Sequence, residues 1–267
     1  LVNNLLTEYK IQTVYHAAAY KHVPLIEENP LEGLRNNALG TQSLIEKCIE
    51  ADVSSFVLIS TDKAVRPTNV MGASKRIAEM IVQHTARCFP ERKLGIVRFG
   101  NVLDSSGSVV PLFREQINKR LPITVTHPEI TRYFMSIEEA ARLVIQAGAM
   151  SNNGEVFLLD MGDPVRIHDL AIQMIELSGL IPEKDIPLQY TGLRPGEKLY
   201  EELLIDPVQS QPTQHPRIFC SKEPMPDADT LEKGVIELTE AITRRDLASA
   251  LDSMKRLVPE YNPENGQ

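Results

Sequence analysis

Short strand-like runs alternate with amphipathic segments through the first hundred residues, and this alternation constrains the fold more than any other feature. The runs 13–16, 55–60 and 94–99 are apolar and rich in Val, Ile and aromatic residues. Between them, apolar residues recur every three or four positions over 40–50 and 74–88, as on one face of a helix. We therefore predict an α/β fold in which a doubly wound parallel sheet carries helices on both faces.

The alternation loosens after about residue 105. Further elements are predicted beside these, separated by proline-containing loops: helices at 1–9, 110–120, 137–149 and 167–177, a strand at 155–159, and one long helix at 235–257. We expect residues 1–105 to form part of the doubly wound core. Residues 106–267 should form mainly a smaller C-terminal α/β region that interleaves with that core.

Composition narrows the class of protein. The chain has 267 residues, 42% of them hydrophobic and 24% charged, which is typical of globular proteins. A net charge of −8 gives no reason to expect nucleic acid as a partner. Cys48, Cys88 and Cys220 lie too far apart for a metal site, so no metal is predicted and reduced thiols are expected. No apolar run is long enough to predict a membrane span, and no signal peptide is visible.

The segment Ser60 to Lys75 carries the strongest chemical signal. It reads S-T-D-K-A-V-R-P-T-N-V-M-G-A-S-K and follows an apolar strand-like run. Thr61, Asp62 and Lys63 place a hydroxyl, a carboxyl group and an amine directly after that strand, where α/β folds bind their ligands. The segment is therefore a candidate for acid–base chemistry.

The same segment resembles the active site of the short-chain dehydrogenases/reductases, in which a tyrosine stands four residues before a lysine. Here Met71 stands four residues before Lys75. Methionine can neither accept nor donate a proton. Either the site is inactive, or Thr61, Asp62 and Lys63 have taken over the proton transfers.

Six blocks in the correct order strengthen the resemblance. The chain resembles bacterial 4,6-dehydratases that act on UDP-N-acetylglucosamine, which are extended short-chain dehydrogenases of capsule and O-antigen biosynthesis. The first three blocks are Y-H-A-A-A-Y-K-H-V-P from Tyr15, N-N-A-L-G-T from Asn36, and the segment from Ser60. The others are V-R-F-G-N-V-L from Val97, T-R-Y-F-M from Thr131, and R-P-G-E-K-L-Y-E-E-L from Arg194 to Leu203. One departure is Asp104, which stands where many relatives carry glycine.

This resemblance implies a Rossmann-like fold that binds NAD or NADP. Such a fold needs a glycine-rich turn after its first strand, where backbone amides hold the pyrophosphate. The sequence contains no G-x-G-x-x-G or G-x-x-G-x-x-G pattern. It also begins without Met, in a helix-like segment that runs straight into a strand. We therefore expect the N-terminal phosphate-binding half to precede this chain, and expect residues 1–267 alone to bind NAD weakly and to be inactive.

The resemblance also implies roles for the catalytic segment. Asp62 would protonate the departing 6-hydroxyl of the sugar, Lys63 would take the proton from carbon 5, and Thr61 would contact the 4-hydroxyl. As a base, Lys63 needs a lowered pKa, which burial near Lys75 would allow. Large, membrane-anchored members of the family also carry methionine at the position of Met71, so an active enzyme is implied. Asp62, acting through water, is then the candidate acceptor of the 4-hydroxyl proton.

Cofactor-binding residues are expected in three places. Small side chains after the first strand would let a flat cofactor lie against the backbone; these are Ala17, Ala18 and Ala19. The alternative is ordinary tight packing of a helix on the strand, and the resemblance favours the cofactor. Asn37 is either a helix cap or a kink residue, and the resemblance places it behind Lys75. Lys75 itself would bind the nicotinamide ribose, with Ser60 nearby.

The resemblance assigns the nucleotide-sugar site to residues outside the catalytic segment. Arginines suit a diphosphate because a guanidinium binds phosphate oxygens through two parallel hydrogen bonds, and Arg132 and Arg194 are the candidates. Lys21 would reach the N-acetylglucosamine. The pocket for the uridine and the sugar phosphate would be lined by Asn101, Val109 and Glu197. Surface salt bridges or solvated side chains are the alternative for the charged members.

Three functions compete at this point. A UDP-N-acetylglucosamine 4,6-dehydratase needs the Asp62–Lys63 pair for elimination. The second function is a 4-epimerase or 5-epimerase on the same scaffold; a simple 4-epimerase needs no such pair and usually keeps the tyrosine. A non-catalytic sensor of nucleotide sugars or dinucleotides would explain the lost tyrosine but not the retained Asp62, Lys63 and Lys75. We expect a homo-oligomer at the cytoplasmic side of the membrane, whose full-length parent contacts the membrane only through segments outside this chain.

Overall fold

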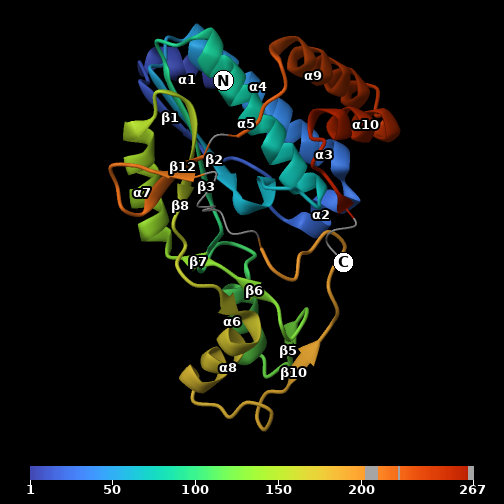
Figure 1. Ribbon diagram of the computed structural model, residues 1–267. Helices are drawn as coiled ribbons and strands as arrows, with labels where there is room; N and C mark the ends of the chain where they lie inside the picture. Colours follow the sequence, from blue (N-terminus) through green and yellow to red (C-terminus); the bar gives the residue numbers. More distant parts are fainter. Residues whose placement is uncertain (202–209, 222, 264–267) are drawn as a thin grey trace.

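A mixed six-stranded sheet forms the centre of the molecule (Figure 1). The computed structural model describes residues 1–201, 210–221 and 223–263. The strand order is β1-β2-β3-β8-β12-β11. Four strands run parallel: β1 (Thr13–His16), β2 (Ser55–Thr61), β3 (Lys93–Phe99) and β8 (Asn153–Leu159). The predicted α/β fold is confirmed, and two antiparallel strands that were not predicted extend it: β12 (Ile218–Ser221) and β11 (Ser210–Pro212).

Helices cover both faces of the sheet (Figure 1). On β2, Phe56 and Leu58 belong to the core shared with α4 (Gly40–Glu50) and α5 (Val70–Cys88). Val57 belongs to the opposite core, beneath α7 (Ile137–Met150). Successive side chains of a strand point to opposite faces, so a strand buried on both sides reads as a nearly continuous apolar run. That is why this strand was visible in the sequence.

Helix α5 begins four residues earlier than its apolar pattern predicted. Asn69 caps it, because its side-chain oxygen accepts a hydrogen bond of 2.8 Å from the backbone nitrogen of Gly72. Met71 therefore lies in the first helical turn, with only 4% of its surface exposed. The early start places Met71 and Lys75 on one helix beside the end of β2.

The predicted single helix at 235–257 is wrong. The structure has two helices there, α9 (Ala228–Thr243) and α10 (Leu247–Leu257), which lie together against α5 (Figure 1). Arg245 has a φ of 56°, and Asp246 caps α10 by accepting a hydrogen bond of 3.1 Å from Ser249 N. Both helices face the same core, so the apolar spacing continues across the turn and conceals it.

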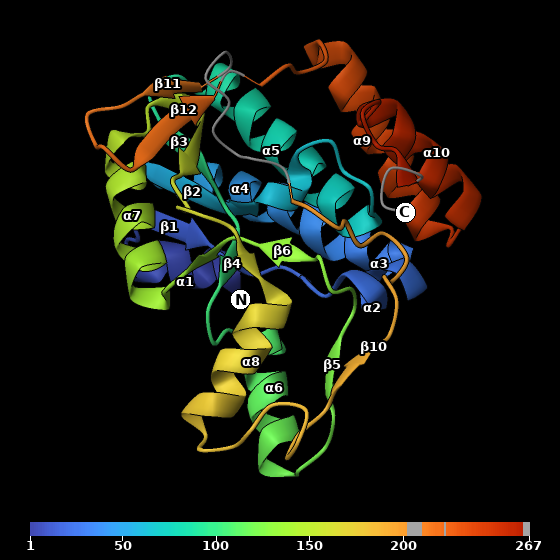
Figure 2. The same ribbon diagram turned by 60° about the horizontal axis from the view of Figure 1, so that its bottom comes forward.

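A smaller lobe lies below the sheet in the view of Figure 2. Its core, which includes Phe113 and Ile175, is separate from the two cores of the sheet. The lobe is built from α6 (Val109–Asn118), β5 (Ile123–Val125), α8 (Ile167–Leu177) and β10 (Leu188–Tyr190). Between β5 and α8 the chain returns to the large sheet as α7 and β8, so the later half of the chain is interleaved with the first. The boundary near residue 105 stays a prediction.

Two short strand pairs connect the sheet to the lobe. They are β4 (Asn101–Val102) with β7 (Phe134–Met135), and β6 (Thr131–Arg132) with β9 (Val165–Arg166). Elements this short carry no periodic signal, and the sequence did not predict them.

The remaining helical elements are α1 (Val2–Glu8), α2 (Val23–Glu28), α3 (Pro30–Leu34), a π-helical turn (Arg35–Leu39) and a 3₁₀ turn (Asp62–Ala64). The predicted helix at 1–9 corresponds to α1, whereas α2 and α3 were missed. Of the helices that the structure describes, none has both the length and the apolar character needed to cross a bilayer.

Candidate active site

A cleft of about 510 Å³ lies where β1, β2 and β3 end, facing the smaller lobe. Most of the residues singled out from the sequence line it: Ala17, Ala19, Lys21, Ser60, Thr61, Lys63, Met71, Lys75, Asn101, Val109, Arg132, Arg194 and Glu197. Ala18, Asn37 and Asp62 do not line it. The carboxyl ends of parallel strands are the usual ligand-binding edge of α/β folds. Segments far apart in the sequence therefore bring their charged and polar side chains together at one site.

Lys75 is buried at the floor of this cleft. Its ammonium donates a hydrogen bond of 2.7 Å to the carbonyl oxygen of Ile59 on β2. Burial lowers the pKa of Lys75 to about 8, although the nearby Glu79 carboxylate acts in the opposite direction. The lysine is therefore held in place by the sheet and lies close to its titration point near neutral pH.

Asn37 fastens the loop after β1 to α5. Its side-chain oxygen accepts from Tyr20 N at 2.8 Å, while its amide donates to Tyr20 O at 2.9 Å and to Ser74 Oγ at 3.0 Å. Asn37 lies in a π-helical turn, so of the two readings of the sequence the kink is the one the structure contains. Because Ser74 immediately precedes Lys75, Asn37 holds the lysine from behind and does not reach the cleft itself.

His16 is a buried residue of the site that the sequence reasoning did not single out. Its Nε2 lies 3.0 Å from Thr41 Oγ, and that hydroxyl donates to Asn37 O at 2.7 Å. The hydroxyl therefore accepts from His16, which places the histidine proton on Nε2. Burial, with a smaller effect from Lys75, lowers the pKa of His16 to about 4, so this histidine stays neutral. The available signal was a histidine at the end of the first predicted strand, directly before three small residues.

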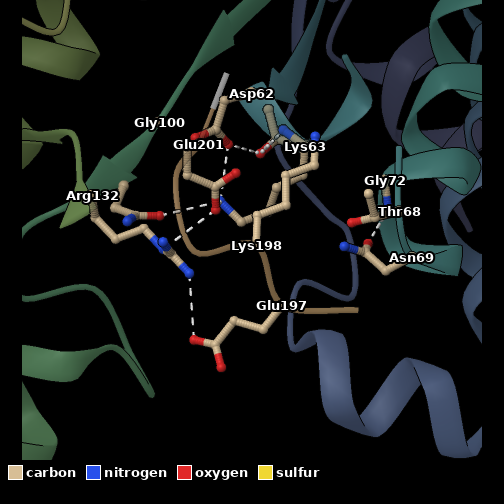
Figure 3. A network of polar contacts seen from close by, with 12 residues as sticks. Asp62, Lys63, Thr68, Asn69, Gly72, Gly100, Arg132, Glu197, Lys198 and Glu201 are labelled. Carbon is tan, nitrogen blue, oxygen red and sulfur yellow. Dashed lines mark hydrogen bonds and ion pairs between the residues drawn. The ribbon is translucent and has the colours of Figure 1, made fainter. Parts of the chain in front are cut away.

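Thr61, Asp62 and Lys63 form one hydrogen-bonded group where β2 passes into the 3₁₀ turn. Figure 3 shows Asp62 and Lys63 of this group. Asp62 Oδ1 accepts from Thr61 Oγ at 2.8 Å and from Lys63 Nζ at 3.0 Å. Lys63 Nζ also lies 3.4 Å from Asn101 Oδ1. Asp62 is 2% exposed, so its contact with Lys63 is not a surface ion pair. Its buried Oδ2 accepts no hydrogen bond from any residue that the structure describes.

Glu201 completes this group (Figure 3). Its Oε1 lies 3.1 Å from Lys63 Nζ and 3.3 Å from Arg132 Nε, and its side chain is 3% exposed. Arg132 also pairs with Glu197, at 3.4 Å. The sequence reasoning gave Glu201 no role, although Glu201 falls within the sixth block of the resemblance. The last two residues of that block, Glu202 and Leu203, lie outside the described residues.

Burial and mutual attraction shift the pKa values of this group in different directions. Burial raises the pKa of Asp62, and the Lys63 ammonium opposes this rise only in part. Burial acts to lower the pKa of Lys63, but the carboxylates of Asp62 and Glu201 outweigh it, and the pKa is raised. The pKa of Glu201 is lowered, because Lys63 and Arg132 outweigh its burial. The expected fall in the pKa of Lys63 is therefore not found, since carboxylates and not Lys75 are its charged neighbours.

Residues 194–201 form a strap across the 3₁₀ turn that contains Asp62 and Lys63. The carbonyl oxygen of Gly196 accepts from Thr68 Oγ at 3.2 Å and from Asn69 Nδ2 at 3.0 Å. Gly196 has a φ of +72°, and a Cβ there would come 2.9 Å from Asn69 Cβ. The Lys198 ammonium donates to Arg66 O at 3.1 Å. These bonds tie the strap to the start of α5 and bring Glu201 to Lys63.

The other predicted substrate residues lie around the rim of the cleft. Lys21 Nζ donates to Ser105 Oγ at 3.3 Å, and burial lowers its pKa. Arg194 is exposed, and its backbone nitrogen donates to Glu197 Oε2 at 3.1 Å. Val109 opens α6 on the side of the smaller lobe.

A second buried ion cluster lies behind Ser60, whose hydroxyl donates to Glu79 Oε1 at 2.5 Å. Arg98 binds both oxygens of Glu79, through Nε at 2.7 Å and Nη2 at 2.6 Å. Arg76 adds a third cationic contact at 3.2 Å, and Glu223 pairs with the far side of Arg98 at 2.7 Å. The Ser60 hydroxyl is therefore engaged with the protein core.

Comparison with known proteins places the chain among enzymes and proteins of surface polysaccharide synthesis. The family described as polysaccharide biosynthesis protein matches residues 1–223. The chain is 60% identical over 200 residues to the capsular polysaccharide biosynthesis protein CapD of Staphylococcus aureus, covering 75% of this chain and 33% of CapD. It is 48% identical over 256 residues to the probable polysaccharide biosynthesis protein EpsC of Bacillus subtilis, covering 95% of this chain and 42% of EpsC. The chain thus spans well under half the length of these two relatives.

Other similarities include enzymes with different reactions. A UDP-glucose 4-epimerase of Rickettsia canadensis is 37% identical over 196 residues, covering 73% of this chain and 56% of the epimerase. The structure of Pen from Bacillus thuringiensis has a TM-score of 0.76 and 36% identity, covering 84% of this chain and 69% of Pen. DesIV of Streptomyces venezuelae, a dTDP-glucose 4,6-dehydratase solved with NAD, has a TM-score of 0.67 at 19% identity, covering 76% of this chain and 66% of DesIV. This last likeness shows the fold alone.

Proposed function

This chain belongs to the polysaccharide biosynthesis protein family, and we propose that it carries the catalytic site of a nucleotide-sugar 4,6-dehydratase. The substrate would be UDP-N-acetylglucosamine and the product a UDP-4-keto-6-deoxy-N-acetylhexosamine. The observation that carries the proposal is the buried Asp62–Lys63 pair, joined to Thr61 at the edge of a cleft that also contains Lys75. An elimination needs both an acid and a base, and this pair supplies one carboxyl group and one amine.

The side chains at the floor of the cleft suit a nicotinamide cofactor. Ala17 and Ala19 present little bulk, Met71 supplies an apolar surface, and Lys75 supplies a buried ammonium held by Ile59 O. We infer that these residues hold the nicotinamide riboside of NAD, the cofactor present in the DesIV structure. Held there, the cofactor would supply reversible hydride transfer, with carbon 4 of the sugar as donor and carbon 6 as final acceptor, so that the overall reaction is redox-neutral.

The chain's own residues account for the proton transfers. Asp62 has a raised pKa and suits the acid that protonates the departing 6-hydroxyl. Since Asp62 does not line the cleft but bonds to Thr61 and Lys63, which do, its proton would pass to the substrate through one of these two side chains. Lys63 would take the carbon-5 proton in its neutral form. Lys75 would favour the anionic form of a nearby sugar oxygen.

The nucleotide would lie toward the smaller lobe. Arg132 and Arg194 both line the cleft there and supply guanidinium groups for a diphosphate. Lys21, Asn101, Val109 and Glu197 would surround the sugar and the uridine. Glu197 and Glu201 pair with Arg132, so a diphosphate would compete with these carboxylates for the guanidinium.

A 4-epimerase is the second candidate, because the Rickettsia canadensis relative carries that name at 37% identity. Elimination changes the mass of the sugar by one water, and epimerisation does not. The test is therefore mass spectrometry of the product formed from UDP-N-acetylglucosamine by the full-length protein in deuterated solvent. Loss of water with deuterium at carbon 5 supports the dehydratase. An unchanged mass with a new sugar stereochemistry would establish the epimerase, and binding without turnover would leave a sensor.

A further inference from the structure

Glu201 occupies the junction between two parts of the site that the proposed reaction uses separately. A single carboxylate oxygen, Oε1, lies within 3.1 Å of Lys63 Nζ and within 3.3 Å of Arg132 Nε. Lys63 belongs to the turn that holds the proposed acid–base pair, whereas Arg132 lies on β6, one of the short strands between the sheet and the smaller lobe. Figure 3 shows the carboxylate between the two cations. No other residue that the structure describes forms an ion pair with both of these side chains.

The surroundings make this contact strong. The side chains of Glu201, Arg132 and Lys63 are 3%, 10% and 20% exposed, so solvent screens their attraction only in part. Glu201 is also held by the strap, which Gly196 and Lys198 tie to the catalytic turn and the start of α5. The carboxylate is therefore placed by the fold and does not depend on a flexible surface side chain.

We propose that Glu201 is a positioning residue that fixes the amine of Lys63 beside Asp62 and controls how readily this amine gives up its proton. The proposal rests on the dehydratase function, in which Lys63 acts as the base. The carboxylate stabilises the ammonium form of Lys63. The amine can give up its proton once bound substrate and the neighbouring side chains change the charges around it. Arg132 shares the same oxygen, so the site that receives the diphosphate is linked to the base through one side chain.

Among the residues that the structure describes, three charged groups act most strongly on Lys63. They are Asp62 in its own turn, Glu201 from the strap and Arg132 from β6. The two carboxylates favour the ammonium form, and Arg132 disfavours it. Without the charge of Glu201, Asp62 is the one carboxylate of the three groups that still stabilises the ammonium. The repulsion between Arg132 and the Lys63 ammonium is then less fully offset. The pKa of Lys63 must then fall.

The direct test is the pKa of Lys63 in Glu201→Gln and Glu201→Asp variants of the full-length protein. The reactivity of Lys63 toward a small amine-specific reagent is followed against pH by peptide mass spectrometry. We expect the highest pKa in the wild type, an intermediate value in Glu201→Asp, and a fall of roughly one pH unit in Glu201→Gln, the effect of one nearby opposite charge. Glu201→Asp preserves the charge, so the order remains testable if Glu201→Gln does not fold.

Kinetics provide a second readout that a merely structural role would not produce. Since Lys63 must be neutral to act as a base, the ascending limb of the kcat/KM–pH profile, which reports ionisations of the free enzyme, should move to lower pH in Glu201→Gln by the same amount. Glu197→Gln is the matched control, because Glu197 contacts Arg132 but not Lys63. It should change the KM for the UDP-sugar and leave both the limb and the pKa of Lys63 in place.

The outcomes separate the role of Glu201 from the proposed function. If 4,6-dehydratase product forms but the pKa of Lys63 is the same in all three proteins, the role of Glu201 is overturned. If the pKa follows the expected order and the pH limb moves with it, the role is established. If the pKa follows the order while no such product forms, the link between Glu201 and Lys63 is supported and the dehydratase function fails.

Discussion

Two buried glutamates in this protein each lie between two cations, yet their surroundings differ in one decisive respect. Glu79 lies between Arg98 and Arg76, and all three side chains are at most 2% exposed. Glu201 lies between Lys63 and Arg132, two side chains that line the cleft. The first cluster uses guanidinium groups, which remain charged at every relevant pH. The second contains a lysine, whose charge can change.

Hydrogen bonding separates the two clusters further. Both oxygens of Glu79 accept bonds from Arg98, and Ser60 adds another. In the second cluster Asp62 Oδ2 is buried without a partner among the described residues. A fully satisfied cluster holds the fold rigid, whereas an incompletely satisfied one can exchange a proton. The contrast teaches that burial and charge alone do not identify a catalytic group.

The largest effect is expected from the catalytic cluster. Lys63→Met removes the proposed base and Asp62→Asn removes the proposed acid, and each should lower kcat by on the order of 10²–10⁴-fold. Lys63→Met should also abolish exchange of the carbon-5 proton with deuterated solvent, whereas Asp62→Asn should leave part of it. Mass spectrometry of the product measures kcat, and deuterium incorporation at carbon 5 measures the exchange. Near-normal turnover of Lys63→Met would show that the cluster around Glu201 does not differ from the Glu79 cluster by transferring protons.

The core cluster should respond through stability. Glu79→Gln leaves two buried guanidinium groups with too little compensating charge, and the free energy of unfolding should fall by about 3–5 kcal/mol. Glu260→Gln is the matched control, because Glu260 contacts Arg76 at 3.4 Å from a position that is 36% exposed. It should cost at most about 1 kcal/mol. Urea denaturation measures both, and equal losses would contradict a special role for the buried position.

Arg194 offers a test outside both clusters. It lines the cleft with an exposed side chain, whereas Arg132 is paired with two carboxylates. Arg194→Ala should weaken UDP-sugar binding by roughly 1.5–3 kcal/mol, the contribution of one charged hydrogen bond, with a smaller effect on kcat. Calorimetry with UDP measures the change. An unchanged affinity would assign Arg194 a structural role.

Met71 should produce the smallest effect. It packs in the first turn of α5 beside the cleft and has no group that can transfer a proton. Met71→Leu has a similar volume and should retain much of the activity, with a loss of stability below about 1.5 kcal/mol. Met71→Tyr restores the residue usual in short-chain dehydrogenases and serves as the comparison. Loss of activity in Met71→Leu comparable to that in Lys63→Met would give methionine a role that packing does not explain.

The sequence by itself determined the α/β class and the composition of the catalytic turn. Each depends on residues close together in the chain: the apolar strand before Thr61, the polar group Thr61 to Lys63, and the spacing from Met71 to Lys75. Strands β1, β2, β3 and β8 and most of the long helices were predicted within a few residues for the same reason. Local periodicity encodes which face of an element is buried.

Only the tertiary structure decided which distant charges meet. Glu201 reaches Lys63 because the strap is tied to Asn69 and Arg66, and Glu79 reaches Arg98 because α5 crosses β3. The turn between α9 and α10 was hidden for a related reason, since both helices pack on one core. A side chain's charge state depends on all the groups that surround it, and those groups come from segments whose proximity no local pattern records.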